Sequence, residues 1–301
     1  MTPAVRPMRA IGLKVFYLFQ ITVMLSLIKV IDGLPLLELM FFRLLLATLF
    51  IAGILAARGA LVSSLATKRP MAHLARSGLA MLNMGFTFVA VRYLPLPEAI
   101  TLQYTQPLFV VALSAAFLSA PVGLSRWVAV AVGFVGVLII TWPKLSLLSH
   151  GVSALSQEEL IGLMAALGAA LTVALTLLWV AALVRTERST TVALWMGIYG
   201  SAMVLVGAPF GWVLPSPQQW ALLTLVGALG AGAQLTLTES LRAAPASTSA
   251  PFEYSSLIFA TLIGWFAFGE WPAPNTLVGS ALLISAGLAV IWHERRLMLR
   301  L

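Results

Sequence analysis

The chain has 301 residues, of which 60% are hydrophobic and 9% are charged, and its mean hydropathy is +1.00. Because about a quarter of the residues of a soluble domain are charged, this composition excludes an ordinary soluble protein. The net charge of +8 comes from basic residues that stand singly or in pairs between apolar runs, which is typical of membrane loops and predicts no nucleic-acid partner.

Apolar windows of about 20 residues, the length that a helix needs to cross a bilayer, occur along the whole chain. They are continuously apolar and do not alternate as barrel strands do, so the sequence predicts transmembrane helices. Ten windows are bounded by charges or by turn residues, and they cover approximately 10–30, 36–57, 74–91, 97–118, 126–142, 160–183, 191–213, 218–238, 246–269 and 274–292.

The distribution of Lys and Arg predicts that both termini are cytoplasmic. With the N-terminus inside, 14 of the 18 basic residues fall on the cytoplasmic side, and the other four are Lys29, Arg43, Arg92 and Lys144. The longest predicted outer loop, 146–158, divides the chain into 1–145 and 159–301, with five windows in each part. An odd number of spans per part requires that the two parts have inverted orientations.

A weak internal repeat supports this division. At an offset of 150 residues, Arg92, Pro95, Tyr104 and Phe109 recur as Arg242, Pro245, Tyr254 and Phe259. We therefore expect an all-α integral membrane protein in which ten transmembrane helices form two inverted five-helix repeats around a central cavity. Inverted repeats of this kind are typical of secondary transporters, whose substrate site lies near the membrane midplane.

Two matching polar belts interrupt apolar windows, and they are the best candidates for a substrate site. The first belt is Gln103, Tyr104, Thr105 and Gln106, and the second is Glu253, Tyr254, Ser255 and Ser256. Each tyrosine lies nine residues after a proline that starts its window, so each belt is about 13 Å into the membrane. The alternative is that these side chains only form hydrogen bonds between neighbouring helices.

Two ionisable residues lie inside predicted spans, where a charge needs a partner or a cavity. Glu253 could carry a coupling proton, or it could be a hydrogen-bonded carboxyl group without that role. Arg43 is five residues from Glu38 and therefore on another face of its helix, so it needs a partner from a different helix or an anionic group of the substrate.

Further cavity candidates are uncharged. Asn83 and Gln234 occupy the windows that precede the two belts. Trp179 and Tyr199 could form aromatic walls, although aromatic residues near span ends are more often interfacial anchors.

The sequence offers little for catalysis. It has no cysteine and three histidines, all at predicted span edges or loops, and it lacks a glycine-rich phosphate-binding loop followed by lysine. We therefore expect neither an enzyme nor an ATP-driven pump, and no cofactor or bound metal.

Several segments resemble the EamA type of the drug/metabolite transporter superfamily. They are 37–43 (LELMFFR), 92–100 (RYLPLPEAI), 107–110 (PLFV), 133–139 (GFVGVLI), 268–270 (FGE) and 287–291 (GLAVI). The resemblance implies ten spans in two inverted five-helix repeats, and members export or import amino acids, nucleotide-like metabolites, cofactors and drugs. An acidic residue that the family often has after span four is Ala120 here, whereas its second-half counterpart, Glu270, is present.

Together these features predict a secondary-active transporter of the bacterial inner membrane that works by alternating access. The cargo would be a small molecule. The first hypothesis is export of amino acids or related compounds. Because the stretch 41–140 resembles members that take up S-adenosylmethionine or riboflavin, import of a cofactor-like metabolite is the alternative. A channel is the alternative from another class, but it would need a continuous polar stripe. Partners beyond the cargo are membrane lipid and a coupling proton, and the protein would be a monomer or homodimer.

Overall fold

The computed structural model describes residues 6–94, 96–117, 123–142, 156–209, 211–269 and 274–298. Within these ranges the chain is helical and contains no β-strand. The helical elements are α1 (Pro7–Lys29), α2 (Leu36–Ala57), α3 (Leu61–Leu65), α4 (Pro70–Tyr93), α5 (Leu96–Gln103), α6 (Gln106–Phe117), α7 (Leu124–Thr141), α9 (Gln157–Leu183), α10 (Ser189–Leu205), α11 (Pro217–Ala243), α12 (Ala246–Ser249), the 3-10 helix η3 (Ala250–Tyr254), α13 (Ser255–Phe268) and α14 (Pro274–Met298). Most of the predicted outer loop, as well as Ala120 and Glu270, lies outside the described residues.

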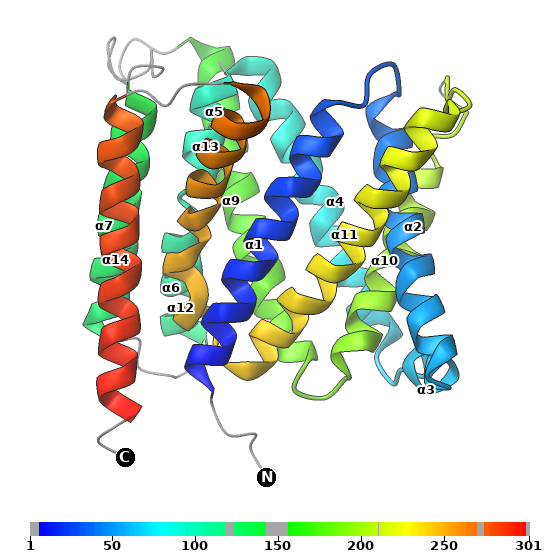
Figure 1. Cartoon of the computed structure of the whole chain (residues 1–301), viewed down its shortest axis with the longest axis horizontal. Coiled ribbons are helices and arrows are strands. Elements are labelled where there is room, and N and C mark those ends of the chain that lie inside the picture. Colours follow the sequence, from blue (N-terminus) through cyan, green and yellow to red (C-terminus); the bar gives the residue numbers. More distant parts are fainter. Residues whose placement is uncertain are drawn as a thin grey trace.

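Seven helical segments of the described chain are long and apolar enough to cross a membrane. They are 7–28, 36–57, 99–117, 124–141, 157–183, 217–243 and 274–293, and the shorter apolar helix α10 covers 189–205. The helices run roughly alongside one another between two faces, with α1 and α11 in front of α9 and α4, and this bundle is called the helix layer below (Figure 1). The helix α1 begins on the same face at which α14 ends. The chain is therefore a multi-pass membrane protein.

Helix starts on the two faces of the layer are stabilised in different ways. On the face where the chain begins, α1 and α4 start with Pro7 and Pro70, residues whose missing N–H would have no helical partner there. On the opposite face, α9 and α11 start with capping boxes, in which Ser156 pairs with Glu159 and Ser216 pairs with Gln219 (Figure 1). These caps provide hydrogen-bond acceptors for backbone N–H groups, which lipid could not provide.

Two of the ten sequence windows contain broken helices, although the sequence predicts continuous ones. The window 97–118 is divided into α5 and α6 just before Pro107, and the window 246–269 is divided into α12, η3 and α13 around Pro251. Proline lacks a backbone N–H and disfavours helical geometry in the residue before it, which explains both interruptions. The breaks fall at the two polar belts.

The packing of the helices follows a regular pattern. The helix α1 packs against α11 in the same way that α4 packs against α9, while α7 packs against α14 and α2 against α10. In Figure 1, α7 and α14 form one edge of the layer, and α2 and α10 lie toward the other. The broken segments α5–α6 and α12–α13 lie between the α7–α14 pair and the remaining helices, so their breaks are shielded from the surrounding lipid by protein.

The fold predicts that the α9–α10 linker and the start of α11 lie on opposite sides of the membrane. Thr186 and Gln218 are exposed at these two positions, and the chain has no cysteine. In separate Thr186→Cys and Gln218→Cys variants, a membrane-impermeant thiol reagent should label only one of the two in intact cells. Permeabilisation should expose the other. Labelling of both variants in intact cells would contradict this arrangement.

Candidate functional site

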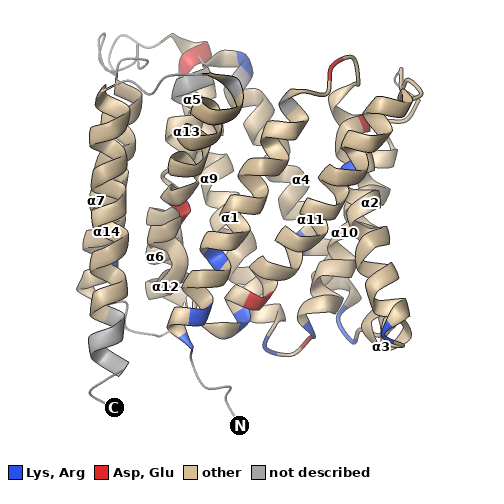
Figure 2. Cartoon of the chain, viewed as in Figure 1, with Lys and Arg blue, Asp and Glu red and all other residues tan. Residues whose placement is uncertain are grey.

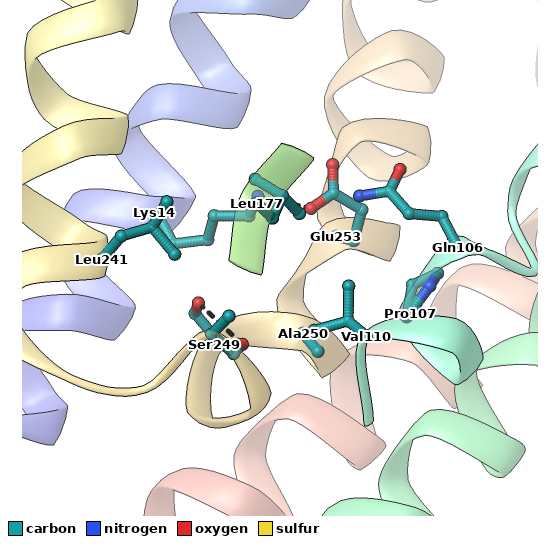
Figure 3. Close-up of a pocket in the computed structure, with 10 residues that line it drawn as sticks. Lys14, Gln106, Pro107, Val110, Leu177, Leu241, Ser249, Ala250 and Glu253 are labelled. Carbon is teal, nitrogen blue, oxygen red and sulfur yellow. Dashed lines mark hydrogen bonds and ion pairs between the residues drawn. The ribbon is translucent and has the colours of Figure 1, made fainter. Parts of the chain in front are cut away.

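The two helix breaks meet at a buried ion pair. Lys14 of α1 binds the carboxylate of Glu253 in η3, and the side chains of Lys14 and Glu253 are 3% and 16% exposed. Figure 3 shows the two side chains extended toward each other, with the amide of Gln106 beside the carboxylate. The Lys14 ammonium also lies 4.8 Å from the ring centroid of Tyr17, within the range of a cation–π interaction.

Local sequence explains why Glu253 lies in a break and not inside a regular helix. Pro251 removes a backbone donor, and the chain passes through one 3-10 segment before α13 begins at Ser255. The Ser256 hydroxyl donates to the Glu253 carbonyl at 2.8 Å, which satisfies a backbone acceptor near the break. The carboxylate is thereby presented to α1 and α6, whose Lys14 and Gln106 lie across from it.

A small cavity adjoins the ion pair. It is lined by Lys14, Gln106, Pro107, Val110, Leu177, Leu241, Ala246, Ser249, Ala250 and Glu253. Its volume is about 10 Å³, which is close to the minimum that a single water molecule needs. The lining is apolar except for four polar side chains, so the ion pair is the strongest polar feature of a closed space between α1, α6, α9, α11 and η3.

The two belt tyrosines lie close together but have different surroundings. Their ring centroids are 6.2 Å apart. Tyr104 is partly buried, and its hydroxyl is 3.3 Å from the hydroxyl of Ser256. Tyr254 is 1% exposed, donates to the Val130 carbonyl at 3.3 Å and covers Gly133 of α7, where an added Cβ would overlap the ring.

A second small cavity contains two of the other predicted residues. Arg43 of α2 and Gln234 of α11 line it together with Leu44, Ala47, Thr48, Ile51, Ala193, Met196, Gly197 and Gly230. Within the part of the chain that is described, the Arg43 side chain forms no hydrogen bond or ion pair, and the Gln234 amide nitrogen is buried without a partner. The nearby acidic residue Glu38 instead accepts the Val213 backbone N–H at 2.9 Å.

The remaining predicted residues lie outside both cavities. Asn83 donates to the Ala169 carbonyl at 2.9 Å and thus links α4 to α9. Trp179 is 42% exposed and donates to the Ala72 carbonyl at 3.0 Å, whereas the Tyr199 ring packs on Trp195. Gln103 is the last residue of α5.

Sequence reasoning missed three residues of the central region. Lys14 and Arg76 are counted there among the 14 basic residues of the cytoplasmic side, but both are 3% exposed within helices. Tyr17 follows Lys14 by three residues and so shares its helix face, and its ring lies beside the Lys14 ammonium. The position of Lys14 inside the first apolar window was the signal that could have revealed its partner.

The surroundings of Tyr254 predict a large packing contribution. Tyr254→Ala should lower the free energy of unfolding by about 3 kcal/mol, because it removes a buried ring from a contact that its neighbours cannot fill. Tyr254→Phe should cost about 1 kcal/mol, the value of one hydrogen bond. Thermal unfolding of the purified variants in detergent measures both, with Tyr104→Ala as the control. Equal stability of Tyr104→Ala and Tyr254→Ala would contradict this assignment.

Comparison with known proteins identifies the family. The model of the EamA-like transporter family matches the chain twice, at residues 15–142 and 160–292. A solved crystal structure superposes with a TM-score of 0.78 at 17% identity, covering 96% of this chain and 97% of the other, which shows a shared fold.

Three named relatives are similar over most of their length. The chain is 30% identical to a riboflavin transporter of Rhizobium johnstonii over 78% of this chain and 74% of that protein. It is 25% identical to an S-adenosylmethionine uptake transporter of Rickettsia bellii (87% and 85% covered) and 28% identical to the pseudopaline exporter CntI of Pseudomonas aeruginosa (90% and 92% covered). The chain belongs to the EamA-like transporter family.

Proposed function

We propose that the protein is a secondary-active transporter that moves small metabolites across the bacterial inner membrane by alternating access. The observation that carries this proposal is the buried Lys14–Glu253 ion pair, which lines a closed cavity at the junction of two broken helices. Broken helices that meet at polar residues within the membrane are typical of transporter substrate sites. Membership of a transporter family supports the same activity.

The proposed architecture is ten spans in two inverted five-helix repeats, 1–145 and 159–301. A helix or a pair of half-helices occupies each of the ten sequence windows. The family model matches once in each part. In the two parts, α1 corresponds to α9 and α4 corresponds to α11. The α1–α11 contact therefore has its counterpart in the α4–α9 contact, as an inverted repeat requires. Alternating access would then be a rocking of one repeat against the other around the cavity.

The proposed orientation places both termini in the cytoplasm. Figure 2 shows most Lys and Arg on the face of the layer where α1 begins and α14 ends. This bias supports a cytoplasmic position for that face under the positive-inside rule. The named bacterial relatives support the inner membrane as the location.

Two cargo classes are open to this site. Export of amino acids or related compounds is the first, and an exporter among the relatives supports that direction. Uptake of a cofactor-like metabolite is the second, and the names of the riboflavin and S-adenosylmethionine relatives favour it. Both classes contain molecules that are far larger than the cavity beside the ion pair, so this cavity would have to widen to bind its cargo.

Counterflow in liposomes tests the transport activity itself. Purified protein should accumulate a labelled compound against an internal excess of the same unlabelled compound, and the panel contains amino acids, riboflavin and S-adenosylmethionine. A transporter exchanges bound cargo without net flux, whereas a channel only equilibrates it. Absence of counterflow for the whole panel, together with passive equilibration of one compound, would support a channel instead.

We also propose that Glu253 carries the coupling proton. Protonation of the carboxyl group would remove the charge that holds Lys14, so proton binding and the α1–η3 contact would be linked. Glu253→Gln should therefore abolish accumulation driven by a pH gradient while preserving exchange, because exchange needs no net proton movement. Glu239→Gln, at an exposed ion pair with Arg9, is the matched control and should behave as the unmodified protein. Full pH-driven accumulation by Glu253→Gln would exclude Glu253 as the proton carrier.

A further inference from the structure

The interior of the helix layer has an excess of positive charge. Five charged side chains are described there: Lys14, Glu253, Arg43, Arg76 and Glu38, which is 1% exposed and accepts the Val213 backbone N–H. The first two neutralise each other in an ion pair. The two arginines form no ion pair in the described structure, and even with Glu38 counted the interior retains a net positive charge. A charge within the membrane region that lacks a protein partner indicates a place where a ligand can supply one.

Arg76 is the clearest case of a buried charge without a described partner in the protein. It is 3% exposed in α4, and its Nε and one Nη atom are buried without a hydrogen-bond partner among the described residues. One helical turn earlier, His73 is fully buried, with both ring nitrogens also unpartnered. A buried donor without an acceptor destabilises the folded protein, and this loss of stability is largest when the donor is charged. The fold alone gives no structural reason to retain an arginine at this position.

Arg43, which is partly buried and lines a small cavity, lies nearer the other face of the layer. It lies seven residues into α2, which begins on the face opposite to the start of α4 (Figure 1), whereas Arg76 lies six residues into α4. At 1.5 Å per residue, each guanidinium group is on a residue about 10 Å along its helix from its own face. The two regions are adjacent, because Ser77, the neighbour of Arg76, donates to Met196 Sδ at 3.6 Å, and Met196 lines the cavity that contains Arg43.

The unpartnered nitrogens of Gln234 and Arg76 are hydrogen-bond donors. The Gln234 amide nitrogen lines the Arg43 cavity without an acceptor, and two nitrogens of Arg76 have none. A ligand that completes these groups must bring acceptor oxygens and negative charge. Carboxylates and phosphates match a guanidinium fork with two parallel hydrogen bonds, which a neutral carbonyl or hydroxyl does not.

We infer that the cargo carries at least one carboxylate or phosphate group, and that Arg43 and Arg76 bind this group from the two sides of the closed centre. This inference rests on the proposed transport function and narrows its substrate class. Amino acids and S-adenosylmethionine carry a carboxylate, and riboflavin does so only after phosphorylation, as its 5′-phosphate ester. Lys14 is paired with Glu253 in this structure, so the two arginines remain as the available cationic groups.

Matched pairs of probes that differ in charge test the inference by binding alone. The pairs are riboflavin 5′-phosphate with riboflavin, and L-phenylalanine with L-phenylalaninamide, titrated into the purified protein in nanodiscs while its thermal unfolding is followed. In at least one pair the carboxylate or phosphate member should bind about tenfold more tightly than its neutral or cationic partner. Equal or tighter binding by the members that lack the anionic group in both pairs would overturn the inference.

Variants then assign the effect to the two arginines. Arg43→Gln and Arg76→Gln should each remove the preference for the anionic probe, while Arg43→Lys should keep part of it because the charge remains. Arg185→Gln, at an exposed position in the α9–α10 linker, is the control and should keep all of it. If Arg76→Gln does not fold, the Arg43→Gln and Arg43→Lys comparison decides. An unchanged preference in Arg43→Gln would overturn the assignment.

Counterflow on the same preparation separates this inference from the transport proposal. If a transported compound carries a carboxylate or phosphate, and Arg43→Gln weakens its exchange, the result supports both the transport proposal and the inference about the cargo. A transported compound without any anionic group would leave the transport proposal standing and overturn the inference about the cargo. Preferential anion binding without counterflow would support the arginine site and contradict transport.

Discussion

A charge inside a helix layer that faces lipid must find an opposite charge or a polar cavity, and this requirement determines where the centre of the protein forms. Lys14 lies within an apolar span, so a compensating carboxylate stabilises the position of α1 in the membrane. The compensating carboxylate, Glu253, is on a segment that is not a regular helix. The ion pair therefore fixes α1 against the break between α12 and α13, and the neighbouring elements α6, α9 and α11 enclose it.

The same physical constraint accounts for the position of the breaks. An interrupted helix exposes backbone groups that lipid cannot satisfy, so it must be surrounded by protein or by water. Both broken segments pack inside the layer, between the α7–α14 pair and α1 or α9. This arrangement places backbone irregularity, polar belts and buried charge in one region.

Much of the fold is predictable from hydrophobic length alone. Seven described segments are helices that are long and apolar enough to cross a membrane, because roughly 20 apolar residues between charges or turn residues leave few other conformations in a membrane. The breaks were not predicted, although Pro107 and Pro251 lie beside them, since apolarity does not distinguish a continuous helix from two half-helices. The site was predicted in part: Glu253 and Gln106 reach the same cavity, but the partner of Glu253 is 239 residues away in the sequence. Composition and periodicity carry no information about pairing across that distance. Arg76 was counted only among the cytoplasmic charges for the same reason, because its burial depends on helices that follow it in the chain.

The central claim is that the opposite charges of Lys14 and Glu253 hold α1 against η3 at the cavity. Exchange of the two charges in one protein tests it most directly. Lys14→Glu and Glu253→Lys as single variants should each unfold at a markedly lower temperature, because each leaves two like charges in contact within the membrane. The double variant should recover most of the lost thermal stability, since the pair is restored with reversed polarity. Single variants as stable as the unmodified protein, or a double variant no more stable than either single one, would contradict the account.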